Sequence, residues 1–376
     1  MRKKKVFLIF GTRPEAIKMY PVYKELKKYK EINTKIVITS QHQEMLKQVL
    51  DIFDMKADYD LNVMEDRQTL TKITIKVLDG LKKIFDKEKP DLVLVHGDTT
   101  TTFAAALAAF YEKIPIGHVE AGLRTHNKFF PYPEEINRTL TDTLADLHFA
   151  PTNSTRKNLL KEGTPEESIF VTGNTIVDAV QEILNLKTGT PPISITKNDE
   201  KFIIVTAHRR ENWGKPMQNI CESIDFVSKK HKIQFIFSVH KNPLVRKTVK
   251  NVLGKNKYIK LMEPMSYTDF IPLVAKSLFI LTDSGGIQEE APLLHKPVLL
   301  LRNVTERPEA TDSGIVKIIG TEKENIIKNI ENLLDNKEIY NKMSHVKNPF
   351  GDGKSGKRIA TIVKNFLTEE NTYGIL

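Results

Sequence analysis

Short apolar runs alternate with amphipathic stretches along most of the chain. Several runs are apolar on both faces, which is typical of parallel strands covered by helices on both sides of a sheet. Between them, stretches such as residues 69–87 and 266–276 carry apolar residues at helical spacing. This alternation predicts a doubly wound α/β fold. The expected strands are residues 6–10, 35–39, 92–96, 114–119, 147–150, 202–206, 234–239, 259–262, 278–282, 298–301 and 315–319.

The alternation is interrupted once, at residues 186–200. This segment, LKTGTPPISITKNDE, has no periodicity and contains a glycine and two adjacent prolines, which predicts a surface linker or loop. Because similar patterns lie on both sides of it, we expect two α/β domains that face a central cleft, with a hinge between residues 173 and 200. The expected boundaries are residues 1–172, residues 173–354, and a terminal helix in 355–376 that crosses back to the first domain.

Length and composition agree with two soluble domains. The chain has 376 residues, 40% of them apolar and 28% charged, which excludes a disordered, collagen-like or coiled-coil chain. A single cysteine, Cys221, excludes an internal disulfide framework and a cysteine-built zinc site and fits a reducing compartment. The N-terminal apolar run is too short for a signal peptide, and residues 99–111, the longest uncharged stretch, are too few to span a membrane. We therefore expect a cytoplasmic protein without a membrane partner.

The net charge is positive, with 57 basic and 47 acidic residues giving a formal charge of +10. The lysines are spread over predicted helix faces and are not gathered with aromatic residues. This favours a solvated surface, or a local field that attracts an anionic small molecule, over a nucleic-acid interface.

The first predicted strand leads into residues 11–18, GTRPEAIK. Gly11 permits a tight turn, and Pro14 suits the first turn of a helix because its missing N–H would be unbonded there anyway. Arg13 and Lys18 then stand near the carboxyl end of a strand, where open α/β sheets bind ligands. Both suit an anionic ligand such as a phosphate, although solvated surface charges remain the alternative.

Carboxylates follow the next predicted strands. Asp98 and Glu120 leave successive strands at the same edge, and PEEINR adds Glu134 and Glu135 at a helix start bounded by prolines. Each acid could simply cap a helix, but several at one edge favour acid–base chemistry. His96-x-Asp98 and His118-x-Glu120 could together bind a metal ion, although a histidine at a strand end is more often hydrogen-bonded structure.

The second half carries cations and a glycine turn. A predicted strand leads into His208-Arg-Arg-Glu211, where we expect one of the two arginines to pair with Glu211 and the cluster to suit a diphosphate. Another strand turns through DSGG into a helix, and its bare backbone N–H groups suit a phosphate. We expect Glu290 to accept hydrogen bonds from ribose hydroxyls, and Arg307 to add a cation at the same edge of the sheet. A G-x-G-x-x-G sequence directly after a predicted strand is absent, as is a Walker A sequence, so the nicotinamide fingerprint is missing.

Taken together, eight segments resemble the non-hydrolysing UDP-N-acetylglucosamine 2-epimerases, which interconvert UDP-GlcNAc and UDP-ManNAc. The resemblance covers most of the chain and implies two Rossmann-like domains arranged as in glycosyltransferases of B type, a homodimer, and neither a metal nor a nicotinamide cofactor. The matching segments are GTRPEAIKM, HGDTTTT, HVEAGLRT, PEEINR, VTGNTIVDA, TAHRREN, DSGGIQEEAP and TERPEA, in this order from Gly11 to Ala310.

The resemblance also implies roles for individual residues. The implied catalytic residues are Asp98, Glu120, Glu134 and His208. The implied UDP- or substrate-binding residues are Arg13, Lys18, Asp98, Glu120, His208, Met265, Phe270, Ser284, Gly285, Gly286, Glu290 and Arg307. A second substrate site that activates the bacterial enzymes matches Gln41, Glu44, Arg67, Glu211 and His240. The position of Glu44 is usually glutamine in the family, which bears on the strength of activation.

The chemistry explains this residue set. No carbonyl acidifies the C2–H bond of a nucleotide sugar, so the resemblance implies elimination of UDP to a 2-acetamidoglucal followed by re-addition. Fixed cations must stabilise the departing diphosphate, and an acid and a base must act at C2. Which carboxylate takes which role stays open. The alternatives are a UDP-sugar glycosyltransferase, a hydrolysing epimerase that releases ManNAc and UDP, and a nucleotide-sugar sensor without activity.

Overall fold

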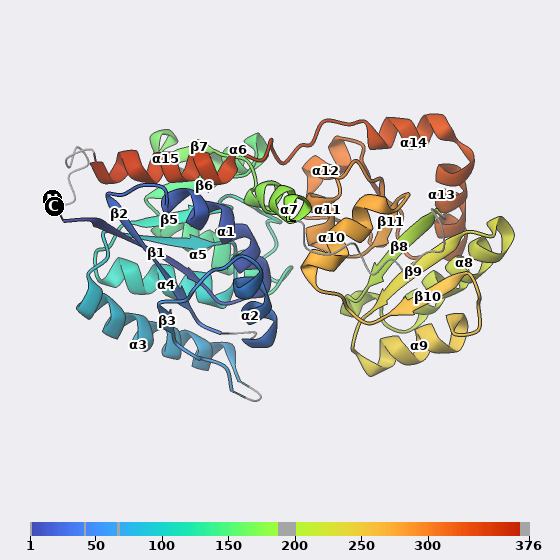
Figure 1. The fold of residues 1–376 in the computed structure, drawn as a ribbon, viewed down its shortest axis with the longest axis horizontal. Coiled ribbons are helices and arrows are strands. Elements are labelled where there is room, and N and C mark those ends of the chain that lie inside the picture. The colour runs from blue at the N-terminus through green and yellow to red at the C-terminus, as the bar shows by residue number, and fades with distance from the viewer. Residues whose placement is uncertain (1, 41–42, 66–67, 187–200, 369–376) are drawn as a thin grey trace. The chain divides into compact units, whose positions relative to one another are not determined.

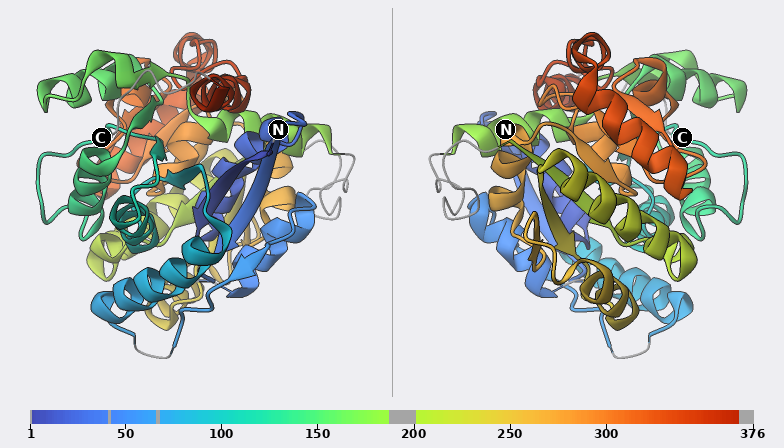
Figure 2. Two further views of the ribbon diagram at one scale, coloured as in Figure 1. Left: turned by 90° about the vertical axis from the view of Figure 1, so that its left-hand side faces the viewer. Right: turned by 90° about the vertical axis from the view of Figure 1, so that its right-hand side faces the viewer.

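The computed structural model describes residues 2–40, 43–65, 68–186 and 201–368 and divides into two compact α/β units (Figure 1). Unit 1 comprises Met1–Ala179 and Phe350–Leu376, and unit 2 comprises Val180–Pro349. Each unit has its own parallel sheet, with helices on both faces (Figures 1 and 2). The predicted doubly wound α/β fold is therefore confirmed.

The sheet of unit 1 has seven strands in the order β3-β2-β1-β4-β5-β6-β7, and every neighbouring pair is parallel. Its strands are β1 (Lys4–Phe10), β2 (Ile32–Ile38), β3 (Tyr59–Asp60), β4 (Leu92–His96), β5 (Ile116–Val119), β6 (Leu147–Ala150) and β7 (Ile169–Val171). Its helices are α1 (Arg13–Leu26), α2 (Gln43–Ile52), α3 (Leu70–Glu88), α4 (Thr100–Tyr111), α5 (Glu134–Leu144), α6 (Asn153–Lys161) and α15 (Ser355–Thr368), with α7 (Thr175–Asn185) at the boundary of the units.

The sheet of unit 2 has six parallel strands in the order β10-β9-β8-β11-β12-β13. Its strands are β8 (Phe202–Ala207), β9 (Gln234–Val239), β10 (Ile259–Met262), β11 (Ile280–Thr282), β12 (Val298–Leu300) and β13 (Val316–Ile318). Its helices are α8 (Lys215–His231), α9 (Pro243–Leu253), α10 (Tyr267–Lys276), α11 (Gly285–Glu290), α12 (Pro308–Asp312), α13 (Lys323–Asp335) and α14 (Lys337–Ser344).

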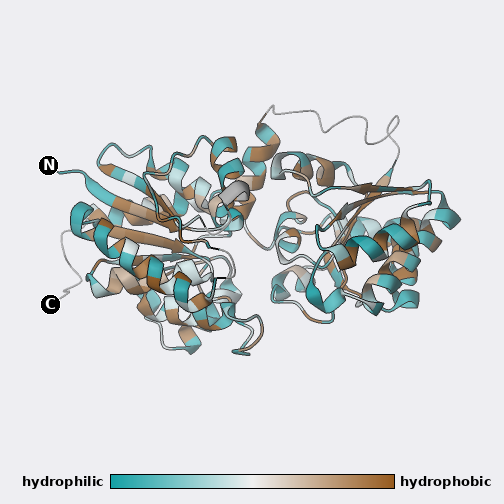
Figure 3. Cartoon of the chain, turned by 90° about the horizontal axis from the view of Figure 1, so that it is seen from below, coloured by the Kyte–Doolittle hydropathy of each residue, from teal (hydrophilic) through white to brown (hydrophobic). Residues whose placement is uncertain are grey.

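The central strands of both sheets are buried on both faces, as their continuous apolar sequences predict. In β1 the run from Val6 to Phe10 has no exposed surface, and in unit 2 Phe235, Phe237 and Phe279 are likewise fully buried. Figure 3 shows these strands as apolar bands flanked by helices that alternate between apolar and polar residues. Burial of this kind stabilises each sheet and leaves its loops to carry the chemistry.

Two strands of unit 1, β3 and β7, are not predicted from the sequence pattern. β3 has two residues and β7 has three, and both lie at the edges of the unit 1 sheet. Edge strands need no long apolar run, because one side of each is unpaired and their burial is incomplete. The predicted linker lies outside the described residues from position 187 to position 200.

The last helix, α15, packs against α1 within unit 1. A Cβ atom at Gly356 would lie only 2.7 Å from the backbone of Pro21, so glycine permits this close approach. The carboxylate of Asp178 accepts hydrogen bonds from the backbone N–H groups of Ser355 (3.2 Å) and Gly356 (2.9 Å) and so caps the helix start. Among the described helices, none is both long and apolar enough to cross a bilayer.

Candidate active site

The strand order of unit 1 creates one topological switch point. The chain runs from β1 outward through β2 and β3 and then returns to place β4 on the other side of β1. Ligands of open α/β sheets bind at the carboxyl ends of the strands beside such a switch. The turns that leave β1, β4 and β5 carry Arg13, Asp98 and Glu120, so the structure brings these predicted residues to one edge of one sheet.

A buried glutamate shapes this edge. One carboxylate oxygen of Glu15 accepts hydrogen bonds from the backbone N–H groups of Gly11 (3.0 Å) and Thr12 (2.7 Å). Its other oxygen accepts hydrogen bonds from the hydroxyl groups of Thr99 (2.7 Å) and Thr102 (3.0 Å). Glu15 thus ties the turn after β1 to the start of α4. Sequence reasoning assigned it no role, although an acid three residues after a threonine is the signature of a capping box.

Asp98 is held by a buried arginine. Its Oδ2 lies 2.7 Å from Nη2 of Arg138, and the side chain of Asn137 donates to its backbone carbonyl at 3.0 Å. Arg138 is buried, whereas 28% of the Asp98 side chain is exposed. Arg138 therefore balances the charge of Asp98 and orients it while leaving part of the carboxylate accessible. The sequence placed Arg138 in a matching segment but gave no sign of its partner.

Glu120 lies in a second ionic cluster. Its Oε2 forms an ion pair with the ammonium of Lys18 and lies 3.3 Å from both Nε2 of His96 and Nδ2 of Asn174. Its backbone has a φ of +69°, a conformation that residues other than glycine rarely adopt and that often marks functional positions. Lys18 is predicted to bind phosphate. The structure puts its ammonium against Glu120, so phosphate binding by Lys18 stays a prediction.

The two acids that begin α5 have different surroundings. Glu135 is buried and accepts hydrogen bonds from the backbone N–H groups of Thr125 (2.9 Å) and His126 (2.8 Å). It therefore holds the preceding loop. Glu134, the predicted catalytic residue, is the first residue of α5 and is partly exposed at the helix N-terminus.

The two His-x-acid pairs do not form a common metal site. His118 lies 2.5 Å from Asp142 through Nδ1 and 2.7 Å from the carbonyl of Gly97 through Nε2, whereas His96 lies beside Glu120. Burial would raise the pKa of Asp142, but His118 and Arg124 outweigh it and lower that pKa. His118 is thus a structural histidine with both ring nitrogens in use.

Unit 2 repeats the switch point with different residues. The chain runs from β8 outward through β9 and β10, and β11 then pairs with the other side of β8. The turn after β8 carries His208 and Arg209, and the turn after β11 carries Asp283 and the Ser-Gly-Gly segment. The structure therefore brings the two predicted nucleotide-binding segments of this unit together.

Asp283 organises this second switch point. It is fully buried. Its Oδ2 accepts hydrogen bonds from the backbone N–H groups of His208 (2.8 Å) and Arg209 (2.9 Å) and from the side-chain amide of Asn212 (2.9 Å). Its Oδ1 lies 3.1 Å from Nδ1 of His208. Burial would raise the pKa of Asp283, but the contacts with His208 and these donors outweigh it and lower that pKa. Sequence reasoning assigned Asp283 no role.

A ladder of ion pairs borders the same turn. Glu306 lies 3.2 Å from Arg209 and 2.7 Å from Arg302, and Arg302 lies 3.1 Å from Glu211. The prediction that Arg209 or Arg210 pairs with Glu211 is wrong. The partner of Glu211 is Arg302, which follows the carboxyl end of β12, and Arg209 pairs with Glu306 instead. Burial would raise the pKa of Glu306, but the surrounding arginines lower it to about 2.

A Cβ atom at either glycine of the turn after β11 would make ordinary van der Waals contacts and no clash. Gly285 and Gly286 begin α11, and a Cβ atom at Gly285 would meet nothing closer than the Arg209 guanidinium at 3.5 Å. Glu290, at the end of α11, accepts a hydrogen bond from the Tyr267 hydroxyl at 3.0 Å, which fixes it to α10. The remaining predicted UDP-binding residues of this unit are Met265 just before α10, Phe270 on α10, Ser284 at the start of α11, and Arg307, which pairs with buried Glu289.

The predicted second substrate site is described only in part. Gln41 and Arg67 lie outside the described residues, and Glu44 belongs to α2. His240 follows β9, and its ring lies 5.9 Å from that of His208 in a stacked arrangement. Burial and the neighbouring His208 lower the pKa of His240. The grouping of these residues into one site stays a prediction.

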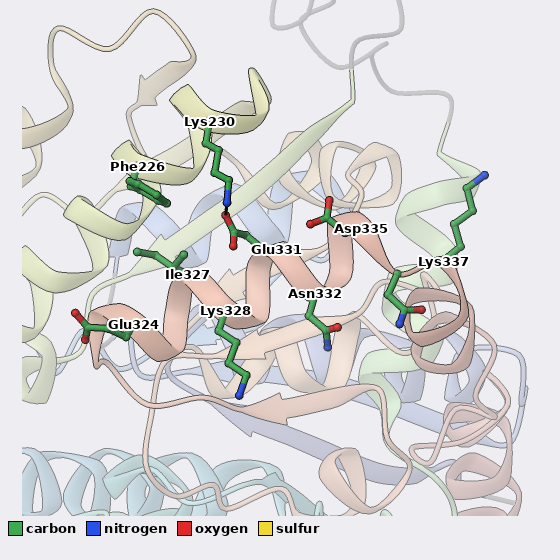
Figure 4. A pocket seen from close by; sticks show the side chains of 10 residues that line it. Phe226, Lys230, Glu324, Ile327, Lys328, Glu331, Asn332, Asp335 and Lys337 are labelled. Atoms are coloured by element: carbon green, nitrogen blue, oxygen red, sulfur yellow. Dashed lines mark hydrogen bonds and ion pairs between the residues drawn. The ribbon is translucent and has the colours of Figure 1, made fainter.

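A surface hollow of roughly 1090 Å³ lies along α8 and α13 (Figure 4). Its lining includes Phe226, Ile327 and the ion pair between Lys230 and Glu331, whose atoms are 2.8 Å apart. None of the predicted site residues lines it. Its lining residues lie on α8, on α13 and at the start of α14, and none of them belongs to a turn that leaves the carboxyl end of a strand, so it is not the candidate site.

Comparison with known proteins identifies close relatives. A family model described as UDP-N-acetylglucosamine 2-epimerase matches residues 24–364. The UDP-N-acetylglucosamine 2-epimerase of Bacillus subtilis is 52% identical over 361 residues, covering 96% of this chain and 94% of that protein. The protein of the same name from Neisseria meningitidis is 50% identical over 370 residues, covering 96% and 100%.

Solved structures agree with these sequence relationships. The UDP-GlcNAc 2-epimerase from Neisseria meningitidis bound to UDP-GlcNAc superposes with a TM-score of 0.91 at 49% identity, covering 96% of this chain and 100% of that one. The Methanocaldococcus jannaschii UDP-GlcNAc 2-epimerase in complex with UDP-GlcNAc and UDP has a TM-score of 0.82 at 40% identity, covering 96% and 99%.

Proposed function

Because this chain belongs to the UDP-N-acetylglucosamine 2-epimerase family, we propose that it interconverts UDP-GlcNAc and UDP-ManNAc by inverting C2 without hydrolysis. One structural observation carries the proposal beyond the family name. The two switch points hold complementary chemistry: carboxylates paired with buried cations in unit 1, and in unit 2 a histidine after β8 with a glycine turn after the neighbouring strand β11. The first set suits proton transfer, and the second suits a diphosphate.

The proposed reaction is an elimination followed by re-addition. A carboxylate takes the C2 proton, the C–H electron pair forms the C1–C2 double bond, and the C1–O pair leaves with the β-phosphate of UDP. The intermediate is a 2-acetamidoglucal. Delivery of a proton to the opposite face of C2, while a UDP oxygen adds back to C1, gives the epimer. No electrons are gained or lost overall, so the route needs no redox cofactor.

We assign the proton transfers to Asp98, Glu120 and Glu134 of unit 1. One feature of the structure supports this assignment for Asp98 and Glu120. Asp98 and Glu120 each contact a buried cation, Arg138 and Lys18, that fixes the position of the carboxylate. A positioned acid or base contributes roughly 10²–10⁴-fold to a rate, and its position matters as much as its identity.

We propose that residues of unit 2 chiefly stabilise the negative charge on the departing diphosphate. His208 and the backbone N–H groups at Ser284–Gly286 are the proposed donors, with Arg13 as a further cation. Glu290 is proposed to accept the ribose hydroxyls, while Met265 and Phe270 would contact the uracil and Arg307 the nucleotide. Groups held in place before the reaction stabilise developing charge without reorganising, which is the largest contribution expected of this unit.

The homodimer and the activating second site are also proposed from the family resemblance. Light scattering of the purified full-length chain tests the first. A mass near twice the chain's 42.9 kDa supports the dimer, and a mass near 42.9 kDa contradicts it.

Initial rates measured against UDP-GlcNAc concentration test the activating second site, since such a site gives a sigmoidal dependence of rate on concentration and its absence gives a hyperbolic one.

Product analysis separates the proposed function from its alternatives. UDP-GlcNAc carrying ¹⁸O in the C1–O–P bridge is incubated with the protein and followed by ³¹P NMR. The proposal predicts UDP-ManNAc without accumulation of free UDP, together with movement of ¹⁸O into the non-bridging positions of the β-phosphate. Stoichiometric UDP with free ManNAc would indicate a hydrolysing epimerase, UDP release that depends on an acceptor would indicate a transferase, and binding without any product would indicate a sensor.

A further inference from the structure

The pairing of a buried aspartate with His208 has a consequence for the state of the imidazole. We propose that Asp283 is a positioning residue that holds His208 with Nδ1–H directed at its carboxylate and Nε2 turned outward to the ligand. This inference rests on the proposed function, which supplies the diphosphate as the ligand of His208.

The two oxygens of Asp283 have different partners. Oδ2 accepts from two backbone N–H groups and from Asn212, all within 2.9 Å. Oδ1 is buried and makes no hydrogen bond to the described residues, and Nδ1 of His208 lies 3.1 Å from it. An ionised carboxylate oxygen buried without a donor costs free energy, and His208 can supply that donor only when Nδ1 carries the hydrogen.

This arrangement leaves Nε2 as the reactive atom. With Nδ1–H committed to Asp283, Nε2 either offers a lone pair or carries a second proton. In the second case the ring is a cation whose charge Asp283 balances from behind, and Nε2–H can donate to the departing diphosphate oxygen. The side chain of His208 is 43% exposed, so a ligand can reach it although its partner is fully buried.

The other groups near the ring are cationic or titratable. The His240 ring lies 5.9 Å away, and Arg246 donates to the His240 carbonyl at 3.4 Å. The neighbouring Arg209 is paired with Glu306. Within the described ranges, Asp283 is the one carboxylate at ion-pairing distance from the His208 ring. It is therefore the group that can offset these positive neighbours.

The substitution Asp283→Asn separates positioning from loop structure. The amide oxygen of asparagine can still accept the three donors that Oδ2 accepts, so the loop keeps its hydrogen bonds. Its NH₂ group faces Nδ1 and forces the opposite tautomer, with the hydrogen on Nε2. The negative charge is lost as well, so the doubly protonated ring has no counter-charge.

The test uses ¹⁵N-histidine NMR of the full-length protein, with the His208→Gln spectrum identifying the signal. At a pH where the ring is neutral, the wild type should show the Nδ1–H tautomer and Asp283→Asn the Nε2–H tautomer. The variant should also lose at least about 10-fold in kcat, and the alkaline limb of its pH–rate profile should move to lower pH.

The control is Asp178→Asn, which alters another aspartate that accepts hydrogen bonds from two backbone N–H groups but has no histidine partner in the described part of the chain. Its His208 spectrum and pH profile should match the wild type. An Nε2–H tautomer in the wild type overturns the proposal even if Asp283→Asn fails to fold. So does an Asp283→Asn protein with unchanged tautomer and pH profile. The tautomer is read without turnover, so a failure of the epimerase assignment would be distinguishable from a failure of this pairing.

Discussion

The two units use the same strand order around their first strand but opposite charge arrangements at the switch point. In unit 1 the exposed group is a carboxylate, Asp98, and the buried partner is a cation, Arg138. In unit 2 the exposed group is His208, and the buried partner is a carboxylate, Asp283. The same strand order can thus place either a carboxylate or a histidine at the carboxyl end of the strands, each paired with a buried residue of opposite charge type.

The comparison makes a functional division of labour testable. If unit 1 performs proton transfer and unit 2 holds the nucleotide, substitutions in the first should reduce turnover and substitutions in the second should reduce affinity for UDP. A substitution in one unit that changes both kcat and the Kd for UDP would contradict this division, and substitutions that change only one of the two would support it.

The largest effect is expected from Asp98→Asn and Glu120→Gln. Each amide keeps the shape of the carboxylate but cannot take a proton, so kcat should fall at least ~10²-fold. The Kd for UDP, measured by calorimetry, should change less than about threefold. Glu166→Gln, on an exposed glutamate paired with Arg156, serves as the control. Normal turnover in either variant would remove that residue from the mechanism.

Glu306→Gln tests how far unit 2 depends on its central carboxylate. The pKa of Glu306 is lowered to about 2 in the folded protein, so its stabilising effect is complete above about pH 4.5 and is lost as the pH falls toward 2. We expect the variant to lose on the order of 2 kcal/mol at pH 7, and the difference to disappear near pH 2.

The measurement is urea unfolding followed by the fluorescence of Trp213, which is the one tryptophan of the chain and belongs to unit 2. Glu263→Gln, on an exposed acid paired with Arg246, is the control. An equal loss of stability at every pH would show that the effect comes from packing and not from charge.

Glu290→Gln tests the nucleotide-binding side alone. A carboxylate bound to hydroxyl donors contributes more than an amide, and we expect UDP to bind about 10-fold more weakly. The hydrogen bond from Tyr267 can be kept by the glutamine oxygen, so the fold of α10 and α11 should survive. Unchanged affinity together with reduced kcat would place Glu290 in the chemistry and contradict the division of labour.

Arg138→Lys has the smallest expected effect. Lysine keeps the positive charge beside Asp98 but lacks the rigid guanidinium whose Nη2 lies 2.7 Å from Oδ2 of Asp98, so kcat should fall about fivefold while UDP affinity stays unchanged. Circular dichroism and the unfolding midpoint check that α5 remains folded. A variant with full activity would show that the charge alone, and not its geometry, matters at this position.

The sequence predicts where the chemistry gathers but not which charges pair. The strands bordering both switch points are long apolar runs, so the residues that follow them, such as Asp98 and His208, could be assigned to strand ends from pattern alone. The pairing of Lys18 with Glu120 joins residues 102 positions apart. Such contacts depend on the order of strands in the sheet, which no local pattern encodes.

The error at Glu211 has the same origin. Two arginines lie next to Glu211 in the chain, yet its partner is Arg302. Glu211 follows β8 and Arg302 follows β12, and β11 lies between these two strands in the sheet. Likewise, the sequence places Asp283 only at the start of the segment DSGG, and its contact with His208 exists because β8 and β11 are neighbours in the sheet. Charge pairs between turns are therefore the part of a site that needs the three-dimensional structure.

Incorporation of solvent hydrogen at C2 is the most decisive measurement for the proposed elimination and re-addition. UDP-GlcNAc is incubated in D₂O with the protein, without NAD or added metal, and followed by proton NMR. The account predicts that UDP-ManNAc forms and that deuterium enters C2, since the carboxylates of unit 1 exchange their proton with solvent between elimination and re-addition. Product that forms with its original C2 hydrogen retained in every molecule would contradict the account.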